Sequence, residues 1–240
     1  MKIKLVCDLQ AYVRLNQKYP GAVELADRIQ YFFPWKRSLK NGISSLSDQT
    51  IWVVFKAKKC IDAILKPGMK VFEYGMGGST LYFLRNRCVV FSAEHHREWY
   101  QTIAAQITKN NYPDWRGFLR EPDKERRMSA EPDPRYNCCS DFEQYKGQSF
   151  FDYVQVIDQF GDNSFDVVLI DGRARVSCFQ RAYRKVKPGG SLVLDNSERP
   201  RYRPIHQALE GSAWRKQEFF GPGPYVSHEF WGTTVWTRLE

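Results

Sequence analysis

Four short apolar segments, each separated from the next by a helix-like or irregular stretch, constrain the fold of this chain most strongly. The apolar segments are residues 70–74, 88–93, 165–170 and 191–194. Each is bounded by turn residues and rich in β-forming residues, which is typical of strands covered on both faces. Helical patterning follows the first three of them, at residues 79–87, 99–109 and 175–187. This alternation predicts a parallel sheet with right-handed crossovers.

The two ends of the chain follow a different pattern. The N-terminal part predicts an amphipathic helix over 22–33 that ends at Pro34, and a second helix over 51–65. Near the C-terminus, two strand-like stretches at 214–220 and 233–238 flank a Gly-Pro-Gly-Pro turn, which predicts an antiparallel pair. Between the middle strands, a long charged connection contains at most one strand.

Composition narrows the class of protein. Hydrophobic residues make up 42% and the formal net charge is +9, which excludes a mostly disordered chain. The positive charge fits either a polyanionic partner or an enzyme with an anionic ligand. Six cysteines lack zinc-finger spacing, and no apolar run approaches the ~20 residues that span a bilayer. We therefore expect a cytoplasmic protein with reduced thiols and no membrane partner.

A glycine-rich turn lies directly between the first strand and the first helix of the alternating region. Its residues are Glu73-Tyr74-Gly75-Met76-Gly77-Gly78-Ser79-Thr80. Glycines allow backbone N–H groups to approach a ligand closely, and this turn belongs to the sheet edge where ligands bind. A dinucleotide fingerprint requires a third glycine where this chain has Thr80, which disfavours an NAD-dependent oxidoreductase. Glu94 ends the second strand and can accept hydrogen bonds from ribose hydroxyls.

These motifs resemble those of class I S-adenosylmethionine (SAM)-dependent methyltransferases. The resemblance rests on the glycine-rich turn, Glu94, the run Phe-Asp-Val-Val-Leu-Ile-Asp-Gly at 165–172 and the run Lys-Pro-Gly-Gly-Ser-Leu-Val-Leu-Asp-Asn at 187–196. It implies an α/β fold with a Rossmann-like, doubly wound, seven-stranded sheet that is mostly parallel and has an antiparallel last strand. It also implies one domain, with residues 1–50 as an N-terminal helical cap and residues 51–240 as the methyltransferase domain.

The resemblance also implies where SAM binds. The methionine part is expected near the glycine-rich turn and the ribose near Glu94, with the adenine contact at Cys139, Ser140 or Asp141. The candidate cofactor-binding residues are Glu73, Tyr74, Gly75, Gly77, Ser79, Thr80, Glu94, Ser140 and Asp171.

Three oxygen-bearing side chains suggest a metal site. Asp171 ends one strand and Asp195-Asn196 end the next, so parallel neighbours bring these ligands together, and hard oxygen ligands suit Mg²⁺. The pattern is similar to that of cation-dependent O-methyltransferases of the catechol and caffeoyl-CoA type. That group has a lysine three residues after the first aspartate, where this chain has Ala174. The resemblance therefore assigns no general base, and His95, His96 and His206 are candidates because histidine titrates near neutral pH. The candidate catalytic residues are Asp171, His95 and His206.

Two arginine-rich runs, at 171–175 and 198–203, follow these strand ends and favour an anionic substrate. We expect a SAM-dependent methyltransferase that modifies an oxygen of a small molecule, such as a sugar or natural product. An RNA methyltransferase or RNA-binding protein, and a methyltransferase-like fold without catalysis, remain alternatives. A homodimer is compatible with the sequence.

Overall fold

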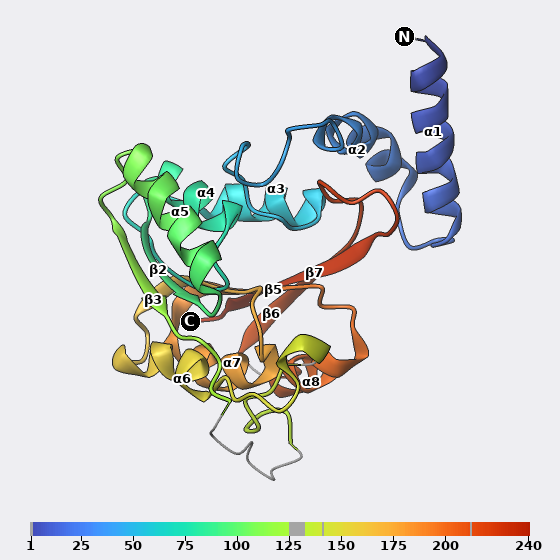
Figure 1. The fold of residues 1–240 in the computed structure, drawn as a ribbon. Helices are drawn as coiled ribbons and strands as arrows, with labels where there is room; N and C mark the ends of the chain where they lie inside the picture. Colours follow the sequence, from blue (N-terminus) through green and yellow to red (C-terminus); the bar gives the residue numbers. More distant parts are fainter. Residues whose placement is uncertain (1, 125–132, 141, 212) are drawn as a thin grey trace.

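The sheet of this protein has seven strands. A computed structural model describes residues 2–124, 133–140, 142–211 and 213–240. The strand order is β3-β2-β1-β4-β5-β7-β6 (Figure 1). The strands are β1 (Lys70–Tyr74), β2 (Val89–Glu94), β3 (Trp115–Leu119), β4 (Phe165–Ile170), β5 (Val186–Asp195), β6 (Trp214–Gly221) and β7 (Trp231–Arg238).

Strand directions confirm the predicted topology. Strands β1 to β5 pair in parallel, and β7 lies antiparallel between β5 and β6. The order reverses between β1 and β4, because the chain builds outward to β3 before it returns to the centre. In open α/β sheets, ligands bind outside the carboxyl ends of the strands at such a switch point.

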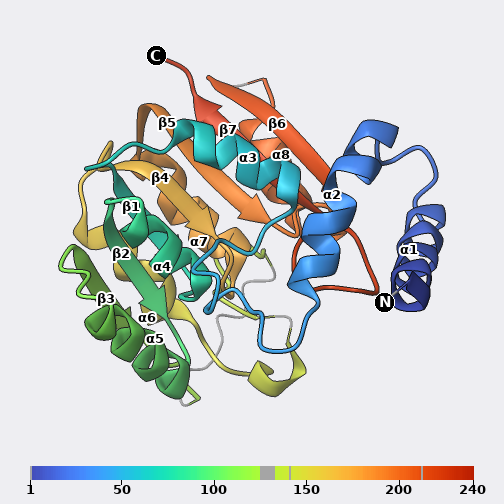
Figure 2. The same cartoon turned by 90° about the horizontal axis from the view of Figure 1, so that it is seen from above.

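Helices cover both faces of the sheet (Figures 1 and 2). One face carries α3 (Phe55–Ile64), α4 (Gly78–Arg85) and α5 (Arg97–Lys109), and the other carries α6 (Phe151–Val154), α7 (Arg175–Ala182) and α8 (Arg203–Leu209). Short 3₁₀ turns occupy Glu143–Tyr145, Gln155–Gln159, Tyr183–Lys185 and Pro200–Tyr202. Each face packs on its own buried apolar cluster, so the central strands are enclosed on both sides. No helix in the described ranges is both long and apolar enough to span a bilayer.

The N-terminal region contains one helix that was not predicted and corrects the end of another. A helix that the sequence patterning did not predict, α1 (Lys2–Gln17), stands beside α2 (Leu25–Ser38), away from the sheet. Pro34 lies inside α2 instead of ending a helix at residue 33. An internal proline costs a helix ~3 kcal/mol, but Trp35 is buried against Tyr12 and Phe32 and bonds the Val226 carbonyl at 2.8 Å. Aromatic burial beyond the proline therefore extends the helix.

The outer side of α1 and α2 carries an apolar groove of about 470 Å³. Its exposed apolar side chains are Leu9, Val13, Leu25, Ile29 and Phe33. Nothing among the described residues covers them. A homodimer stays a prediction.

The loop between α2 and α3 packs tightly on the start of α4. A Cβ atom added to Gly78 would lie 2.4 Å from the Ser45 carbonyl oxygen and 2.5 Å from that of Thr50. Backbone thus touches backbone where the N-terminal region meets the glycine-rich turn. The assignment of residues 1–50 as a cap within one domain stays a prediction, and this contact lies on its boundary.

We expect Gly78→Ala to lower the free energy of unfolding by about 1–3 kcal/mol, because two carbonyls must move to admit the methyl group. Urea denaturation measures this change. Gly161→Ala is the matched control, since the nearest atom to an added Cβ there is 3.9 Å away. Equal stability of the two variants would contradict the close packing.

Candidate functional site

The loops after β1 and β4 meet at the switch point. Gly75 has a φ of +96°, and a Cβ atom there would lie 3.0 Å from the Gly172 backbone. Gly172 in turn lies against the Tyr74 backbone and the Tyr153 hydroxyl, where an added Cβ would clash. Only glycines allow these two loops to approach so closely. The backbone itself therefore forms the floor of the site.

Glu73 holds the glycine-rich turn from inside the protein. Its carboxylate accepts hydrogen bonds from the hydroxyls of Ser79 (2.6 Å), Ser92 (2.7 Å) and Thr80. Thr80 Oγ1 also accepts a hydrogen bond from the Gly77 N–H at 3.0 Å. Burial raises the pKa of Glu73 to about 7, despite these three hydroxyl donors. Its side chain therefore shapes the turn from the interior of the protein.

A cavity of about 380 Å³ opens above this floor. Gly75, Glu94, Asp171 and Gly172 line it, together with Met76 and Arg173. Trp99 and Tyr145 add aromatic surface, and the Trp99 indole N–H bonds the Met76 carbonyl at 2.7 Å. This size is within the range of small-molecule sites, and polar or charged side chains outnumber the apolar and aromatic ones in the lining.

Glu94 is fixed at the bottom of this cavity. One carboxylate oxygen accepts the backbone N–H groups of His95 and His96, both at 2.8 Å, and the other accepts that of Met76 at 3.0 Å. Burial raises the pKa of Glu94, but hydrogen bonds from His95, His96 and Met76 outweigh it and lower the pKa overall. Glu94 is therefore ionised, and Oε2, with one backbone donor, retains accepting capacity.

The two histidine candidates lie in different places. His95 lines the larger cavity; its Nδ1 is 2.8 Å from Glu94 Oε1 and its Nε2 is 3.0 Å from the Tyr145 hydroxyl. His206 lies on α8, where Nε2 is 3.0 Å from the Ser197 carbonyl and the ring packs on Trp236. His206 is not among the residues that line the two cavities at the sheet edge.

Arg175 lies between the strand ends that carry the predicted metal ligands. Its guanidinium donates to the Asp171 carboxylate and carbonyl, both at 2.8 Å, and to the Asp195 carbonyl. Asp195 Oδ1 already accepts from Thr233 at 2.6 Å and Trp231 at 3.0 Å. Burial raises the pKa of Asp195 to about 7, and the nearby Asp171 adds to this.

These contacts do not suit a divalent ion. Such an ion needs carboxylate oxygens that face it. Here Asp195 Oδ1 accepts hydrogen bonds from two neutral donors, and the cationic side chain of Arg175 bridges the two strand ends. No cluster of three His, Cys, Asp or Glu side chains suited to a metal occurs in the described part of the chain. The assignment of Asp171, Asp195 and Asn196 as metal ligands stays a prediction that this geometry does not favour.

The predicted cofactor-binding residues fall into three groups. Gly75, Glu94 and Asp171 line the larger cavity. Glu73, Tyr74, Gly77, Ser79 and Thr80 build the turn, with Tyr74 fully buried and its hydroxyl bonded to the Val154 carbonyl. Ser140 lines a neighbouring smaller cavity, and Asp141 lies outside the described residues. Their roles toward a cofactor stay predictions.

Trp99 and Tyr145 were not predicted as site residues. Trp99 lies in the first turn of α5, the helix that follows the strand end with the predicted acid, so its position was a usable signal. Tyr145 lies in the long connection after β3, where no periodicity indicates which side chain turns inward.

Comparison with known proteins shows the fold. No family model and no curated protein matches the sequence. Solved structures do match: a putative rRNA-methylase from Clostridium thermocellum has 11% identity and a TM-score of 0.54, with 80% of this chain and 98% of that chain covered. A SAM-dependent O-methyltransferase from Thermotoga maritima has 14% identity and a TM-score of 0.52, covering 82% and 72%.

A putative methyltransferase from Streptococcus mutans, solved in complex with SAH, has 8% identity and a TM-score of 0.53, covering 78% of this chain and 99% of that one. The chain therefore has the Rossmann-like fold of SAM-dependent methyltransferases. At these identities the similarity shows the fold alone.

The buried Glu73 carboxyl predicts a pH-dependent stability. Its pKa is about 7 in the folded protein and near 4.5 in the unfolded chain, so the folded state binds more protons between these values. The free energy of unfolding should therefore fall as pH rises from 5 to 8, by about 1–3 kcal/mol for this group.

Glu73→Gln keeps an acceptor for the hydroxyls and removes this titration. Urea denaturation across the pH range should show a flatter profile for Glu73→Gln, and an unchanged profile for Glu210→Gln at an exposed site. Parallel profiles for wild type and Glu73→Gln would show that the carboxyl does not titrate this way.

The bridging role of Arg175 predicts little affinity for Mg²⁺. We expect saturating Mg²⁺ to leave the melting temperature of the metal-free protein unchanged, because a ligand stabilises only the state that binds it. Thermal unfolding in EDTA and in millimolar Mg²⁺ measures this. A rise of several degrees that Asp195→Asn abolishes would restore the metal site.

Proposed function

We propose that this protein is a SAM-dependent methyltransferase that modifies an oxygen of a small molecule. The observation that carries the proposal is Glu94: an ionised carboxylate, anchored by three backbone N–H groups, at the base of a cavity beside a glycine-rich turn. This arrangement suits a nucleoside, because a fixed carboxylate oxygen can accept a ribose hydroxyl.

The residues present fit the cofactor in kind. Gly75 lines the larger cavity, and an added Cβ at Gly77 would meet no atom nearer than 3.9 Å. The aromatic rings of Trp99 and Tyr145 provide flat apolar surface for a base. When bound, SAM supplies a methyl group on a sulfonium, which a nucleophilic oxygen displaces.

The chain's own part in such a reaction is positioning. In-line displacement needs the acceptor oxygen held close to the methyl carbon with water excluded, and good orientation can supply several kcal/mol of the barrier. Asp171 lies at the cavity wall with its side chain 32% exposed. Arg175 bonds its Oδ1, and no described group donates to Oδ2. We propose that Oδ2 accepts the hydrogen bond of the acceptor hydroxyl.

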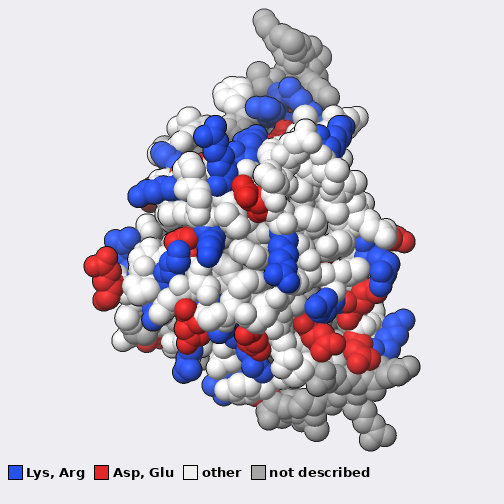
Figure 3. Space-filling view, turned by 90° about the vertical axis from the view of Figure 1, so that its left-hand side faces the viewer, with Lys and Arg blue, Asp and Glu red and all other residues white. Residues whose placement is uncertain are grey.

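The two alternatives have weaker support. RNA methylation draws on the net charge of +9, but on the face in Figure 3 basic and acidic side chains are interspersed and form no continuous basic field. The alternative of a methyltransferase-like fold without catalysis is supported by Ala174, which stands where the cation-dependent group has a lysine. The tests below can favour either alternative.

Calorimetric titration with SAH tests the cofactor site. We expect wild type to bind SAH, and Glu94→Gln to bind it about tenfold or more weakly, since a charge-assisted hydrogen bond contributes about 1.5–3 kcal/mol. Glu98→Gln, at an exposed position on α5, is the matched control and should bind as wild type does.

Thermal unfolding of each variant separates loss of the ligand bond from loss of the fold. A folded wild-type protein that releases no heat with SAH or SAM would overturn the proposal. Binding without methyl transfer to any hydroxyl acceptor in a small-molecule screen would favour the non-catalytic alternative, and transfer to RNA alone would favour the RNA methyltransferase.

A further inference from the structure

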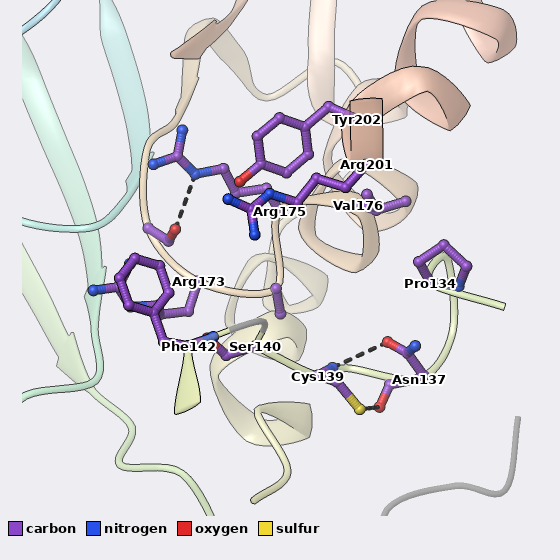
Figure 4. A pocket seen from close by; sticks show the side chains of 12 residues that line it. Pro134, Asn137, Cys139, Ser140, Phe142, Arg173, Arg175, Val176, Arg201 and Tyr202 are labelled. Carbon is purple, nitrogen blue, oxygen red and sulfur yellow. Dashed lines mark hydrogen bonds between the residues drawn. The ribbon is translucent and has the colours of Figure 1, made fainter. Parts of the chain in front are cut away.

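A second, smaller cavity of about 60 Å³ adjoins the larger one. The two share Gly172 and Arg173 as a common wall. Three arginines border the smaller cavity: Arg173 and Arg175 from the loop after β4 and the start of α7, and Arg201 from the turn before α8 (Figure 4). No Asp or Glu is among the described residues that line it. Arg175 is already paired with Asp171, and Arg173 and Arg201 bring two further cationic groups to the same space.

Arg173 is held in place without a carboxylate. Its guanidinium stacks on the Phe142 ring, 3.7 Å from the centroid (Figure 4). No described Asp or Glu forms an ion pair with it, and its buried Nε has no hydrogen-bond partner in the described part of the chain. An aromatic ring thus orients the cation while its hydrogen-bonding capacity stays available to a ligand.

The opposite wall is equally ordered. The buried ring of Tyr202 lies under two guanidinium groups, with its centroid 5.6 Å from Arg175 and 5.4 Å from Arg201. Figure 4 shows the Arg201 side chain reaching over the cavity from the α8 side. The first turn of α7 borders the same space, and its N-cap residue, Ala174, has no side chain that could cap it. The N–H groups of this turn add to the positive potential.

The smaller cavity has room for a compact group. Its volume of about 60 Å³ exceeds the roughly 10–15 Å³ that one water molecule requires, so a small group such as a tetrahedral oxyanion can enter. Guanidinium forks match phosphate oxygens in two-pronged geometry.

We propose that the smaller cavity binds a phosphate group carried by the methyl acceptor. The proposal rests on the proposed methyltransferase function and assigns its substrate class: a phosphorylated hydroxyl compound. The phosphate lies between Arg173 and Arg201, and the acceptor hydroxyl extends past Gly172 toward Asp171 in the larger cavity. The phosphate is not consumed; it fixes the distance between the anchored end of the acceptor and the reacting oxygen.

Titration of the full-length protein with inorganic phosphate tests the site directly. We expect saturable one-site binding, weakened about tenfold or more in Arg201→Gln and in Arg173→Gln, because each loses a charge-assisted pair of hydrogen bonds. Arg184→Gln is the matched control: this arginine is exposed in the 3₁₀ turn Tyr183–Lys185 that follows α7, and it bonds Tyr183. It should bind phosphate as wild type does.

SAH titration of the same variants keeps the two proposals apart. Arg201 lines only the smaller cavity, so Arg201→Gln should bind SAH with wild-type affinity, which also shows that it is folded. Wild type that binds SAH but not phosphate overturns the phosphate site alone. If the wild type binds phosphate but not SAH, the methyltransferase function is overturned and the phosphate site is retained.

Two further titrations identify the anion. Acetate that binds more tightly than phosphate overturns the assignment to a phosphoryl group. A short single-stranded RNA that competes with phosphate, and whose binding falls in Arg201→Gln, overturns the small-molecule source in favour of a nucleic-acid backbone. Phosphate affinity that is the same in Arg201→Gln, Arg173→Gln and wild type overturns the site itself.

Discussion

The close backbone contact between Gly75 and Gly172 is the constraint on which the site depends. Parallel pairing of β1 with β4 brings both loops to one edge, but a side chain on either would hold them apart. Once they touch, Glu73 fastens one loop to α4 and β2, and Arg175 fastens the other to β5. Both cavities are lined by Gly172 of this junction. The buried carboxylate and guanidinium lower local freedom at the point where a ligand must be held.

Much of the fold was predictable because short apolar runs in the local sequence indicate buried strands. Apolar runs such as 165–170 have the same meaning in any parallel sheet, and the antiparallel β7 follows from the Gly-Pro turn before it. Pro34 and α1 were not predictable, since the aromatic cluster that extends α2 draws on Tyr12 and Phe230, distant in the chain. Tertiary packing there outweighs the local rule.

The candidate site was predictable in position and less so in detail. The motifs placed Gly75, Glu94 and Asp171 at one cavity, because strand ends converge by topology. They did not show that the Glu73 side chain faces inward. They also did not show that Asp195 Oδ1 accepts hydrogen bonds from Trp231 and Thr233. Arg175 illustrates the difficulty: in the sequence it is one basic residue in an arginine-rich run, whereas in the structure it is 7% exposed and bridges two strands.

The shared wall of the two cavities links whatever they bind. Arg173 lines both cavities, and its guanidinium is already stacked on Phe142. A charged group bound in one cavity therefore also acts on a ligand in the other, and the effect on affinity is equal whichever ligand arrives first. Two sites on this chain can thus be coupled without any movement of the sheet.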